Sequence, residues 1–337
     1  MEQRISLERM EEAVSLFGSF DENIRLLENE FHVTVVNREE QLIINGEPED
    51  TMLAAKAIEA LLRRHGFHFS KSMGQNFLID ATVPAAIAEA SEAGEGNGVL
   101  EIGPGIGALS HELCRRAGRV VAVELDKALL PILDETMANF DNFEVVSADI
   151  LKTDIPALVR EKLAGLTPIV CANLPYNITT PAITALLESK CFESITVLVQ
   201  KEVAERLCAA PGTAAYGAFS VYMQYHTAPR LLFEVGRECF QPQPKVTSAV
   251  LRAEVRKTPP VVVEDEKFFF RVVYAAFALR RKTIVNSLMT GFGSRLTKEQ
   301  VTEAVVSAGL TPTVRGEKLG LEEFARLARA LAERLPA

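Results

Sequence analysis

Between residues 97 and 200 the chain alternates short apolar runs with longer amphipathic stretches. The runs are rich in valine and isoleucine, which is typical of strands that are buried on both faces. They lie at residues 99–102, 119–124, 143–146, 168–172 and 195–199. Because helical stretches separate these runs, the pattern predicts an α/β fold with a parallel sheet that helices cover on both faces.

The regions before and after this alternation follow other patterns. The first block predicts two helices, two strands and a third helix, at residues 7–17, 24–31, 32–36, 41–44 and 48–64. After Pro211 the chain predicts a β-rich region that ends at residues 246–255. We therefore expect three domains, which cover residues 1–64, 65–256 and 257–337.

The last of these domains is predicted to be helical. One helix is expected over residues 268–283, with a basic cluster at its end. A second follows the capping box from Thr297 to Gln300, in which each side chain can satisfy a backbone N–H group of the other residue. The apolar stripe from Leu321 to Leu335 predicts a third.

Composition narrows the class of protein. Of the 337 residues, 48% are hydrophobic and 24% are charged, so the chain can bury a large core and is not intrinsically disordered. The five cysteines are scattered, with neither CxxC nor zinc-site spacing, which favours a reducing compartment. Neither a membrane-spanning apolar run nor a signal-peptide pattern occurs, and we expect a soluble, cytoplasmic protein.

The charge of the chain is unevenly distributed. The net charge of −9 argues against a nucleic-acid-binding protein, which usually presents a basic face. Residues 1–64 contain 7 basic and 14 acidic side chains, whereas residues 257–337 contain 13 basic and 9 acidic ones. The objection therefore does not extend to the last block, which is net positive.

Glycines and carboxylates follow the first three predicted strands of the sheet. The strand at 99–102 leads into GPGIG at residues 103–107, where glycine lets the backbone approach a ligand closely. Glu124 ends the next strand, and a carboxylate there can accept hydrogen bonds from both hydroxyls of a ribose. Asp149 follows the third strand, where it can accept from an adenine amine or cap a short helix. The spacing admits NAD or S-adenosylmethionine, and the loop alone also fits a tight turn.

The tetrapeptide NLPY, residues 173–176, ends the fourth strand. The amine of a purine is a poor nucleophile, because its lone pair is conjugated with the ring. The side-chain oxygen of Asn173 and a neighbouring backbone carbonyl can accept its two N–H bonds and direct the lone pair towards a methyl donor. Pro175 makes the turn rigid, and Tyr176 offers a face on which a base can stack. An ordinary proline turn is the alternative.

Together the motifs resemble the ribosomal RNA adenine N6,N6-dimethyltransferase family, in its KsgA type that acts on the small subunit. The resemblance extends from about Leu61 to the C-terminus, with every motif in order. The motifs are KSMGQNFL (71–78), EIGPGIG (101–107), VELD (123–126), NLPY (173–176), QKEVAERL (200–207), AYGAFSV (215–221), FQPQPKV (240–246) and FALRRKTIVNSL (277–288). The resemblance implies a Rossmann-like, seven-stranded and mostly parallel methyltransferase sheet with a small helical C-terminal domain.

The family also implies roles for the residues at the matching positions. The cofactor, S-adenosyl-L-methionine, would be bound by Asn76, Leu78, Gly103, Gly105, Glu124, Asp149 and Asn173. The reaction would take place at Asn173, Leu174, Pro175 and Tyr176, with Tyr176 and Phe240 on either side of a target adenine that has left its stack. Phosphates of rRNA would be contacted by Arg280, Arg281 and Lys282, and no metal is implied. Two alternatives stay open: Phe240 also suits a core position, and the basic cluster also suits a helix C-terminus.

The implied activity is dimethylation of the N6 amines of two adjacent adenosines near the 3′ end of 16S rRNA, coupled to maturation of the small subunit. The enzyme would be a monomer whose partner is the small-subunit precursor. One alternative is a methyltransferase that acts on large-subunit rRNA. The other is a ribosome assembly factor for which catalysis is secondary.

The acidic first block is no part of this family pattern. Its predicted elements resemble a KH-type fold, whose GxxG loop binds a nucleic-acid backbone, and the N-terminal segment of PhoH-type ATPases. The loop would be GSFD at residues 18–21, where Asp21 and Glu22 would repel phosphate. The chain has no P-loop GxxxxGK[ST], so no ATPase activity follows. RNA binding and a docking or purely structural role remain as alternatives for this block.

Overall fold

The computed structural model of the 337-residue chain describes residues 2–6, 24, 28, 32–38, 41–65, 77–78, 80, 82–241 and 243–335. Two compact units are present: Met1–Gln200 with Leu232–Val250, and Lys201–Leu231 with Leu251–Ala337. This division differs from the expected boundary at residue 256, because the segment from Lys201 to Leu231 belongs to the same unit as the C-terminal helices.

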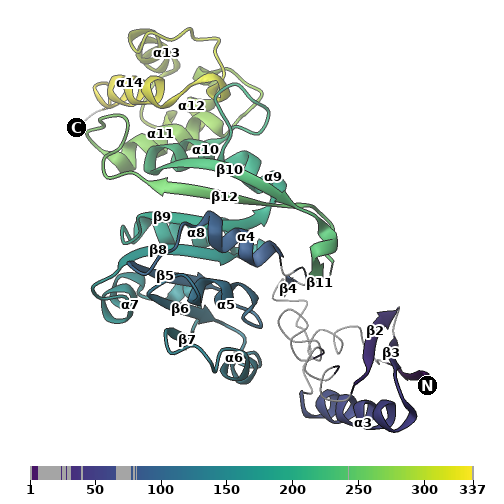
Figure 1. Ribbon diagram of the computed structural model, residues 1–337. Helices are drawn as coiled ribbons and strands as arrows, with labels where there is room; N and C mark the ends of the chain where they lie inside the picture. Colours follow the sequence, from purple (N-terminus) through teal and green to yellow (C-terminus); the bar gives the residue numbers. More distant parts are fainter. Residues whose placement is uncertain are drawn as a thin grey trace. The chain divides into compact units, whose positions relative to one another are not determined.

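A seven-stranded sheet contains every strand that the apolar runs predicted (Figure 1). The strand order is β10-β12-β9-β8-β5-β6-β7, and β9, β8, β5, β6 and β7 pair in parallel. The strands are β5 (Asn97–Ile102), β6 (Arg119–Glu124), β7 (Phe143–Ser147), β8 (Thr167–Asn173), β9 (Ser194–Gln200), β10 (Thr227–Val235) and β12 (Ser248–Val255). The prediction of a parallel α/β sheet is confirmed, and so is the seven-stranded form that the family resemblance implies.

Helices alternate with these strands along the chain. They are α4 (Thr82–Ala90), α5 (Ala108–Cys114), α6 (Leu130–Thr136), α7 (Ile155–Lys162) and α8 (Thr179–Glu188), with the 3₁₀ turns η3 (Ile150–Lys152) and η4 (Tyr176–Ile178). The apolar faces of α4, α5 and α6 and the strands form one buried cluster, in which Val99, Val120 and Leu198 are fully buried. Since β5 is next to both β6 and β8, the carboxyl ends of these three strands lie at one edge of the sheet.

A short two-stranded ladder joins distant parts of the same unit. Strand β4 (Phe77–Leu78) pairs antiparallel with β11 (Phe240–Gln241), so that Phe240 is opposite Leu78. The 3₁₀ turn η5 (Arg237–Cys239) leads directly into β11. Strand β4, which precedes the sheet in the chain, is thereby bound to β11, which precedes the sheet strand β12.

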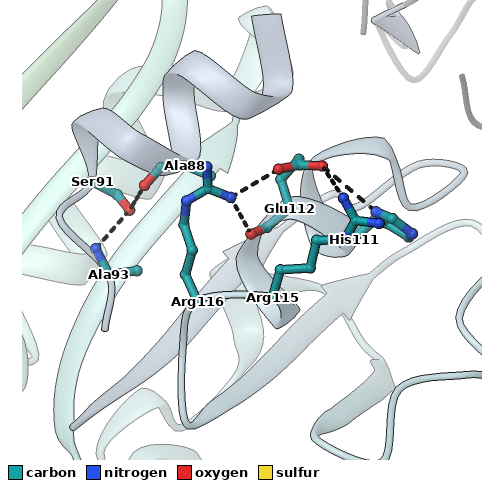
Figure 2. Close-up of polar contacts among 7 residues, drawn as sticks. All are labelled: Ala88, Ser91, Ala93, His111, Glu112, Arg115 and Arg116. Carbon is teal, nitrogen blue, oxygen red and sulfur yellow. Dashed lines mark hydrogen bonds and ion pairs between the residues drawn. The ribbon is translucent and has the colours of Figure 1, made fainter. Parts of the chain in front are cut away.

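A cluster of charges surrounds a mostly buried carboxylate at the end of α5. Glu112 accepts a hydrogen bond from Arg116 at 2.8 Å, and Arg115 and His111 lie 3.6 and 3.7 Å away. Figure 2 shows Glu112 between Arg116 on one side and Arg115 with His111 on the other. Glu112 does not line the cavity at the carboxyl ends of the strands, so a substitution of Glu112 is a suitable control for a substitution of a carboxylate in that cavity.

The first block forms a three-stranded antiparallel sheet with the order β1-β3-β2. Its elements are β1 (Glu2–Ser6), β2 (Thr34–Arg38), β3 (Gln41–Asn45) and α3 (Pro48–His65), of which all but β1 were predicted. Strand β1 is an edge strand in which Ile5 is buried and residues 2–4 are not, so these positions carry no periodic signal. Most of the two other predicted helices and the GSFD loop lie outside the described residues, although Ile24 and Glu28 are helical.

The second unit is mainly helical, as was predicted for residues 257–337, but residues 218–226 form a helix where a β-rich region was expected after Pro211. Its helices are α9 (Lys201–Leu207), α10 (Ala218–His226), α11 (Glu266–Phe277), α12 (Ile284–Phe292), α13 (Lys298–Ser307) and α14 (Leu321–Ala332), with the 3₁₀ turn η6 (Gly316–Lys318). The capping box is confirmed, because Gln300 accepts a hydrogen bond from the Thr297 N–H at 2.8 Å and Thr297 accepts one from the Gln300 N–H at 3.3 Å. Among the described helices of the chain, none is long and apolar enough to cross a membrane.

The expected helix over residues 268–283 is wrong in its C-terminal third. Helix α11 ends at Phe277, and the basic cluster occupies the turn before α12. The carbonyl of Leu279 accepts hydrogen bonds from the Lys282 N–H at 2.8 Å and from the Ser287 hydroxyl at 3.1 Å. These two bonds replace the helical bond of that carbonyl and stabilise the turn.

Candidate functional site

A cavity of about 260 Å³ lies at the carboxyl ends of strands β5, β6 and β8. It is lined by Phe77, Leu78, Ala108, Leu109 and Leu129 and by residues 101–106, 123–125, 148–151 and 173–178. The four segments that the sequence singled out therefore meet at one place. In open α/β sheets this is the edge at which ligands bind.

The glycine loop forms one wall of the cavity. Gly103 and Gly105 have φ angles of +66° and +62°, in the left-handed region that side chains rarely adopt. A Cβ atom on Gly105 would lie 2.9 Å from the ring of Phe77, which is closer than packed carbon atoms approach. The loop therefore has the geometry of a tight turn, and its glycine at position 105 also makes room for an aromatic side chain on the cavity wall.

Glu124 is held at the end of β6 by backbone donors. Its two carboxylate oxygens accept hydrogen bonds from the N–H groups of Asp126 at 2.8 Å and Gly105 at 3.4 Å. Burial raises the pKa of Glu124, and these hydrogen bonds act in the opposite direction. The side chain is thus fixed in one orientation beside the glycine loop, with carboxylate lone pairs that can accept hydroxyl donors from a ligand.

Glu101 lies beneath the same loop and is fully buried. Its Oε2 atom accepts a hydrogen bond from the hydroxyl of Ser110 at 2.6 Å. Burial raises the pKa of Glu101 to about 8, and the charge of nearby Glu124 contributes to the rise. Glu101 therefore keeps its proton at neutral pH, because burial disfavours its charged form.

Replacing Glu101 by glutamine should alter how stability depends on pH. Between the ordinary pKa of 4.5 and about 8, the folded chain keeps a proton on Glu101 that the unfolded chain has lost, so the free energy of unfolding falls as pH rises. Glutamine cannot lose this proton. Urea unfolding at pH 5, 6.5 and 8 should show the Glu101→Gln variant gaining stability relative to the parent as pH rises, whereas a constant difference would contradict the assignment.

Asp149 takes one of the two roles that the sequence left open, and its position is compatible with the other. Its carboxylate caps η3 by accepting the Leu151 N–H at 3.0 Å, and it pairs with Lys152 at 3.3 Å. The same residue lines the cavity. The N-cap role is confirmed, and contact with a cofactor adenine stays a prediction.

NLPY joins the end of β8 to η4 at the cavity. The N–H of Leu174 donates to the carbonyl of Leu198 at 3.1 Å, which anchors the turn to β9. The ring of Pro175 packs over Gly103, at 3.6 Å from the position of a Cβ atom there. Asn173 and Tyr176 line the cavity on either side of this anchored pair. The turn is therefore held against both β9 and the glycine loop, as a site that orients a small group requires.

Phe240 does not occupy the position that the family resemblance implies. Its side chain is 1% exposed, packs in the hydrophobic cluster of the sheet and does not line the cavity. A ring with no exposed face cannot receive a base in this arrangement. The core alternative for Phe240 therefore accounts for its position, and only Tyr176 of the two aromatic residues is available for stacking.

Replacing Phe240 by alanine is accordingly expected to affect folding first. The loss of a fully buried phenylalanine typically lowers the free energy of unfolding by about 3–5 kcal/mol, through lost burial and the remaining cavity. Urea unfolding measures this loss, with Tyr176→Ala as the comparison, since Tyr176 is only partly buried. A loss below about 1 kcal/mol would contradict the core position of Phe240.

Sequence reasoning gave no role to most apolar residues of the cavity wall, among them Phe77, Leu125 and Leu151. Phe77 lies between two predicted cofactor residues, of which Leu78 lines the cavity and Asn76 lies outside the described residues. Leu125 and Leu151 also line the cavity and are 55% and 41% exposed, respectively. Leu125 follows Glu124 directly and Leu151 follows Asp149 by two positions. A large apolar residue next to a carboxylate at a strand end was the signal that could have revealed them.

The basic turn of the second unit divides into two parts. Arg280 pairs with Glu317 at 3.3 Å and donates to the carbonyl of Ala214, so its guanidinium has partners within the unit. Arg281 and Lys282 are exposed in the same turn. Contact with RNA phosphates is therefore easier to reconcile with Arg281 and Lys282 than with Arg280, which ties the turn to η6. Within the described ranges, no group of three or more His, Cys, Asp or Glu side chains could hold a metal ion.

Comparison with known proteins agrees with the geometry. A family model described as ribosomal RNA adenine dimethylase matches residues 66–333. The ribosomal RNA small subunit methyltransferase A of Geobacillus sp. (strain WCH70) is 47% identical over 274 residues, which cover 80% of this chain and 94% of the relative. The protein of the same name from Streptococcus pneumoniae (strain P1031) is 48% identical over 276 residues, which cover 81% and 95%.

Solved structures of a 23S rRNA methyltransferase and of a dimethyladenosine transferase are also similar to this chain. The crystal structure of the 23S rRNA methyltransferase ErmE is 29% identical and has a TM-score of 0.59, covering 76% of this chain and 100% of its own. A dimethyladenosine transferase from Plasmodium falciparum has a TM-score of 0.64 at 21% identity, covers 77% and 98%, and supports the fold alone. The family model begins at residue 66, so the acidic first block lies outside the match. From residue 66 onwards, the chain belongs to the ribosomal RNA adenine dimethylase family.

Proposed function

We propose that this enzyme transfers methyl groups from S-adenosyl-L-methionine to the N6 amines of two adjacent adenosines near the 3′ end of 16S rRNA, and dimethylates each. The observation that carries the proposal is the position of NLPY, which meets the glycine loop and Glu124 in one cavity. Small-subunit rRNA as the substrate is supported by the name of the relatives, ribosomal RNA small subunit methyltransferase A. The enzyme would act as a monomer on a precursor of the small subunit, in the cytoplasm.

The cavity fits the proposed cofactor on three counts. The loop of Gly103 and Gly105 leaves no Cβ atoms in the way of a methionine chain, and Glu124 offers an acceptor for two ribose hydroxyls. Leu125 and Leu151 provide apolar contacts for an adenine ring, with Asp149 beside them to accept from its amine. When bound, the cofactor supplies an electrophilic methyl group on a sulfonium.

The chain itself has to orient the target amine. The side-chain oxygen of Asn173 and the backbone carbonyl of Leu174 would accept the two N–H bonds and direct the nitrogen lone pair into the cavity. Once this nitrogen has accepted the methyl group that the cofactor would supply, it would release one proton to solvent. Because no strong base is needed, alignment and exclusion of water would provide most of the rate acceleration.

Two features would hold the RNA. The target adenine has to leave its stack to reach Asn173, and the ring of Tyr176 lies at the cavity to receive it. Arg281 and Lys282, in the exposed turn of the helical unit, would contact phosphates. The net positive charge of residues 257–337 favours such a contact.

Labelled-methyl transfer is the decisive experiment. Small subunits that lack the modification, fully modified small subunits and large subunits are each incubated with the enzyme and labelled cofactor, and the methylated bases are mapped. The proposal expects label on the unmodified small subunits alone, with four methyl groups on two adjacent adenosines. Label on the large subunit would instead support the alternative suggested by the similarity to ErmE.

A role in ribosome assembly is the second candidate, and it is compatible with catalysis. A slow enzyme that remains on a precursor particle can delay its maturation. A variant that transfers no methyl groups but still binds the particle and disturbs growth would favour this role.

A further inference from the structure

The hydroxyl of Tyr176 is bound by a residue from a distant part of the chain. Tyr176 begins η4, directly after the turn that follows β8, and its Oη atom lies 2.6 Å from the Oγ atom of Ser248. Ser248 is the first residue of β12 and is fully buried. The hydrogen bond thus connects the cavity turn to the strand that follows the FQPQPKV segment.

The turn that carries Tyr176 is also held at its backbone. The hydroxyl of Thr179 is 3.3 Å from the carbonyl oxygens of both Pro175 and Tyr176 and donates to them. With the backbone held by Thr179 and the phenol oxygen held by Ser248, the ring is fixed at both ends. A tyrosine side chain has two main torsions, and a hydrogen bond at its far end restrains both of them.

Restraint of the ring matters for the reaction. A ring that is already in place loses less conformational freedom when a base stacks on it, so binding is stronger without any new contact. Tyr176 lines the cavity while its hydroxyl points to the buried Ser248. The hydrogen bond therefore leaves the ring available to a base and removes the hydroxyl from the surface that the base would contact.

We propose that Ser248 is a positioning residue for the target adenine, which acts by fixing the ring of Tyr176 through their hydrogen bond. This inference rests on the proposed function, in which Tyr176 receives the flipped base. Nothing in it requires Ser248 to touch the RNA or the cofactor. Its effect should appear in the KM for the RNA substrate and not in cofactor affinity.

A double-mutant cycle tests the proposal. Ser248→Ala removes one partner and Tyr176→Phe removes the other while it keeps the stacking ring. Each variant should raise the KM for unmodified small subunits by about fivefold, which corresponds to one hydrogen bond. The double variant should be no worse than either single one, because the same bond is lost in all three. The dissociation constant of the cofactor, measured by titration calorimetry, should stay unchanged.

Ser91→Ala is the matched control. Ser91 is a buried serine of the same unit whose hydroxyl donates to the Ala88 carbonyl at 2.7 Å, and it does not line the cavity (Figure 2). Its removal should affect stability without changing the KM. This comparison separates positioning of Tyr176 from a general loss of stability.

The measurements distinguish failure of the role of Ser248 from failure of the proposed methyltransferase function. The role of Ser248 is overturned if the Ser248→Ala variant has the KM of the parent enzyme. It is also overturned if the effects of the two single substitutions add in the double variant. In both cases, methylation by the parent enzyme leaves the proposed function intact. If the parent enzyme transfers no methyl groups to unmodified small subunits, the proposed function is overturned, and the role of Ser248 with it.

Discussion

Replacing Asn173 by alanine is expected to lower kcat for methyl transfer by about 10²–10³-fold, the usual effect of removing one orienting hydrogen-bonding group from an active site. Asn173 ends β8 at the cavity, next to a turn that β9 and the glycine loop hold in place. Without its side-chain oxygen the target amine loses one of its two acceptors, and its lone pair is directed less precisely. Single-turnover transfer of labelled methyl groups to unmodified small subunits measures the loss.

Asn97→Ala provides a control in the same sheet. Asn97 is at the opposite end of β5, where its side chain accepts from the Gly94 N–H at 2.9 Å and donates to the Thr167 carbonyl at 3.4 Å. This variant should lose stability and keep its rate of transfer. Parent-like transfer by a folded Asn173→Ala variant would refute the role of Asn173.

Replacing Glu124 by glutamine should weaken cofactor binding by about 10–100-fold. A hydrogen bond to a charged acceptor contributes about 1–2 kcal/mol more than a neutral one, and glutamine also turns one of its two acceptors into a donor. That donor would face the N–H of either Gly105 or Asp126. Because burial raises the pKa of Glu124, cofactor affinity of the parent should also fall as the pH is lowered towards that pKa, and the variant should lack this dependence.

Titration calorimetry over a range of pH values measures both effects, and Glu112→Gln is the control. Glu112 is likewise a mostly buried carboxylate of the same unit, but its partners are Arg115, Arg116 and His111 and it does not line the cavity. The same chemical change there should leave cofactor affinity as it is. Equal effects of the two substitutions would show that Glu124 has no specific role.

The parallel sheet could be predicted because its central strands β5, β6, β8 and β9 are largely buried on both faces. Such strands are continuous apolar runs, and β5, β6 and β8 stand out for this reason. Strand β1 could not be found in the same way, because Ile5 is the single buried side chain among those that the structure describes in this strand. The end of α11 was also missed, since the apolar periodicity continues across the turn and the hydrogen bonds of the Leu279 carbonyl are not visible in the sequence.

The polar part of the cavity was predictable and its apolar part was not. Glu124, Asp149 and Asn173 follow recognisable strands, and strand ends meet at one edge by the geometry of a parallel sheet. The positions of Phe77 and Phe240 depend on the pairing of β4 with β11, two segments of two residues each that lie far apart in the chain. Such short strands have no sequence signature, so the burial of Phe240 emerged only from the fold.

The acidic first block has a hydrophobic cluster of its own. Its members among the described residues, from Ile5 to Ile58, include Leu42 and Ile44, and none belongs to the cluster of the methyltransferase sheet. Free-energy changes caused by substitutions in clusters that share no members are expected to add. The block can therefore accumulate changes in its core without altering how tightly the catalytic sheet is packed, which makes the two parts separable under selection even though one chain carries both.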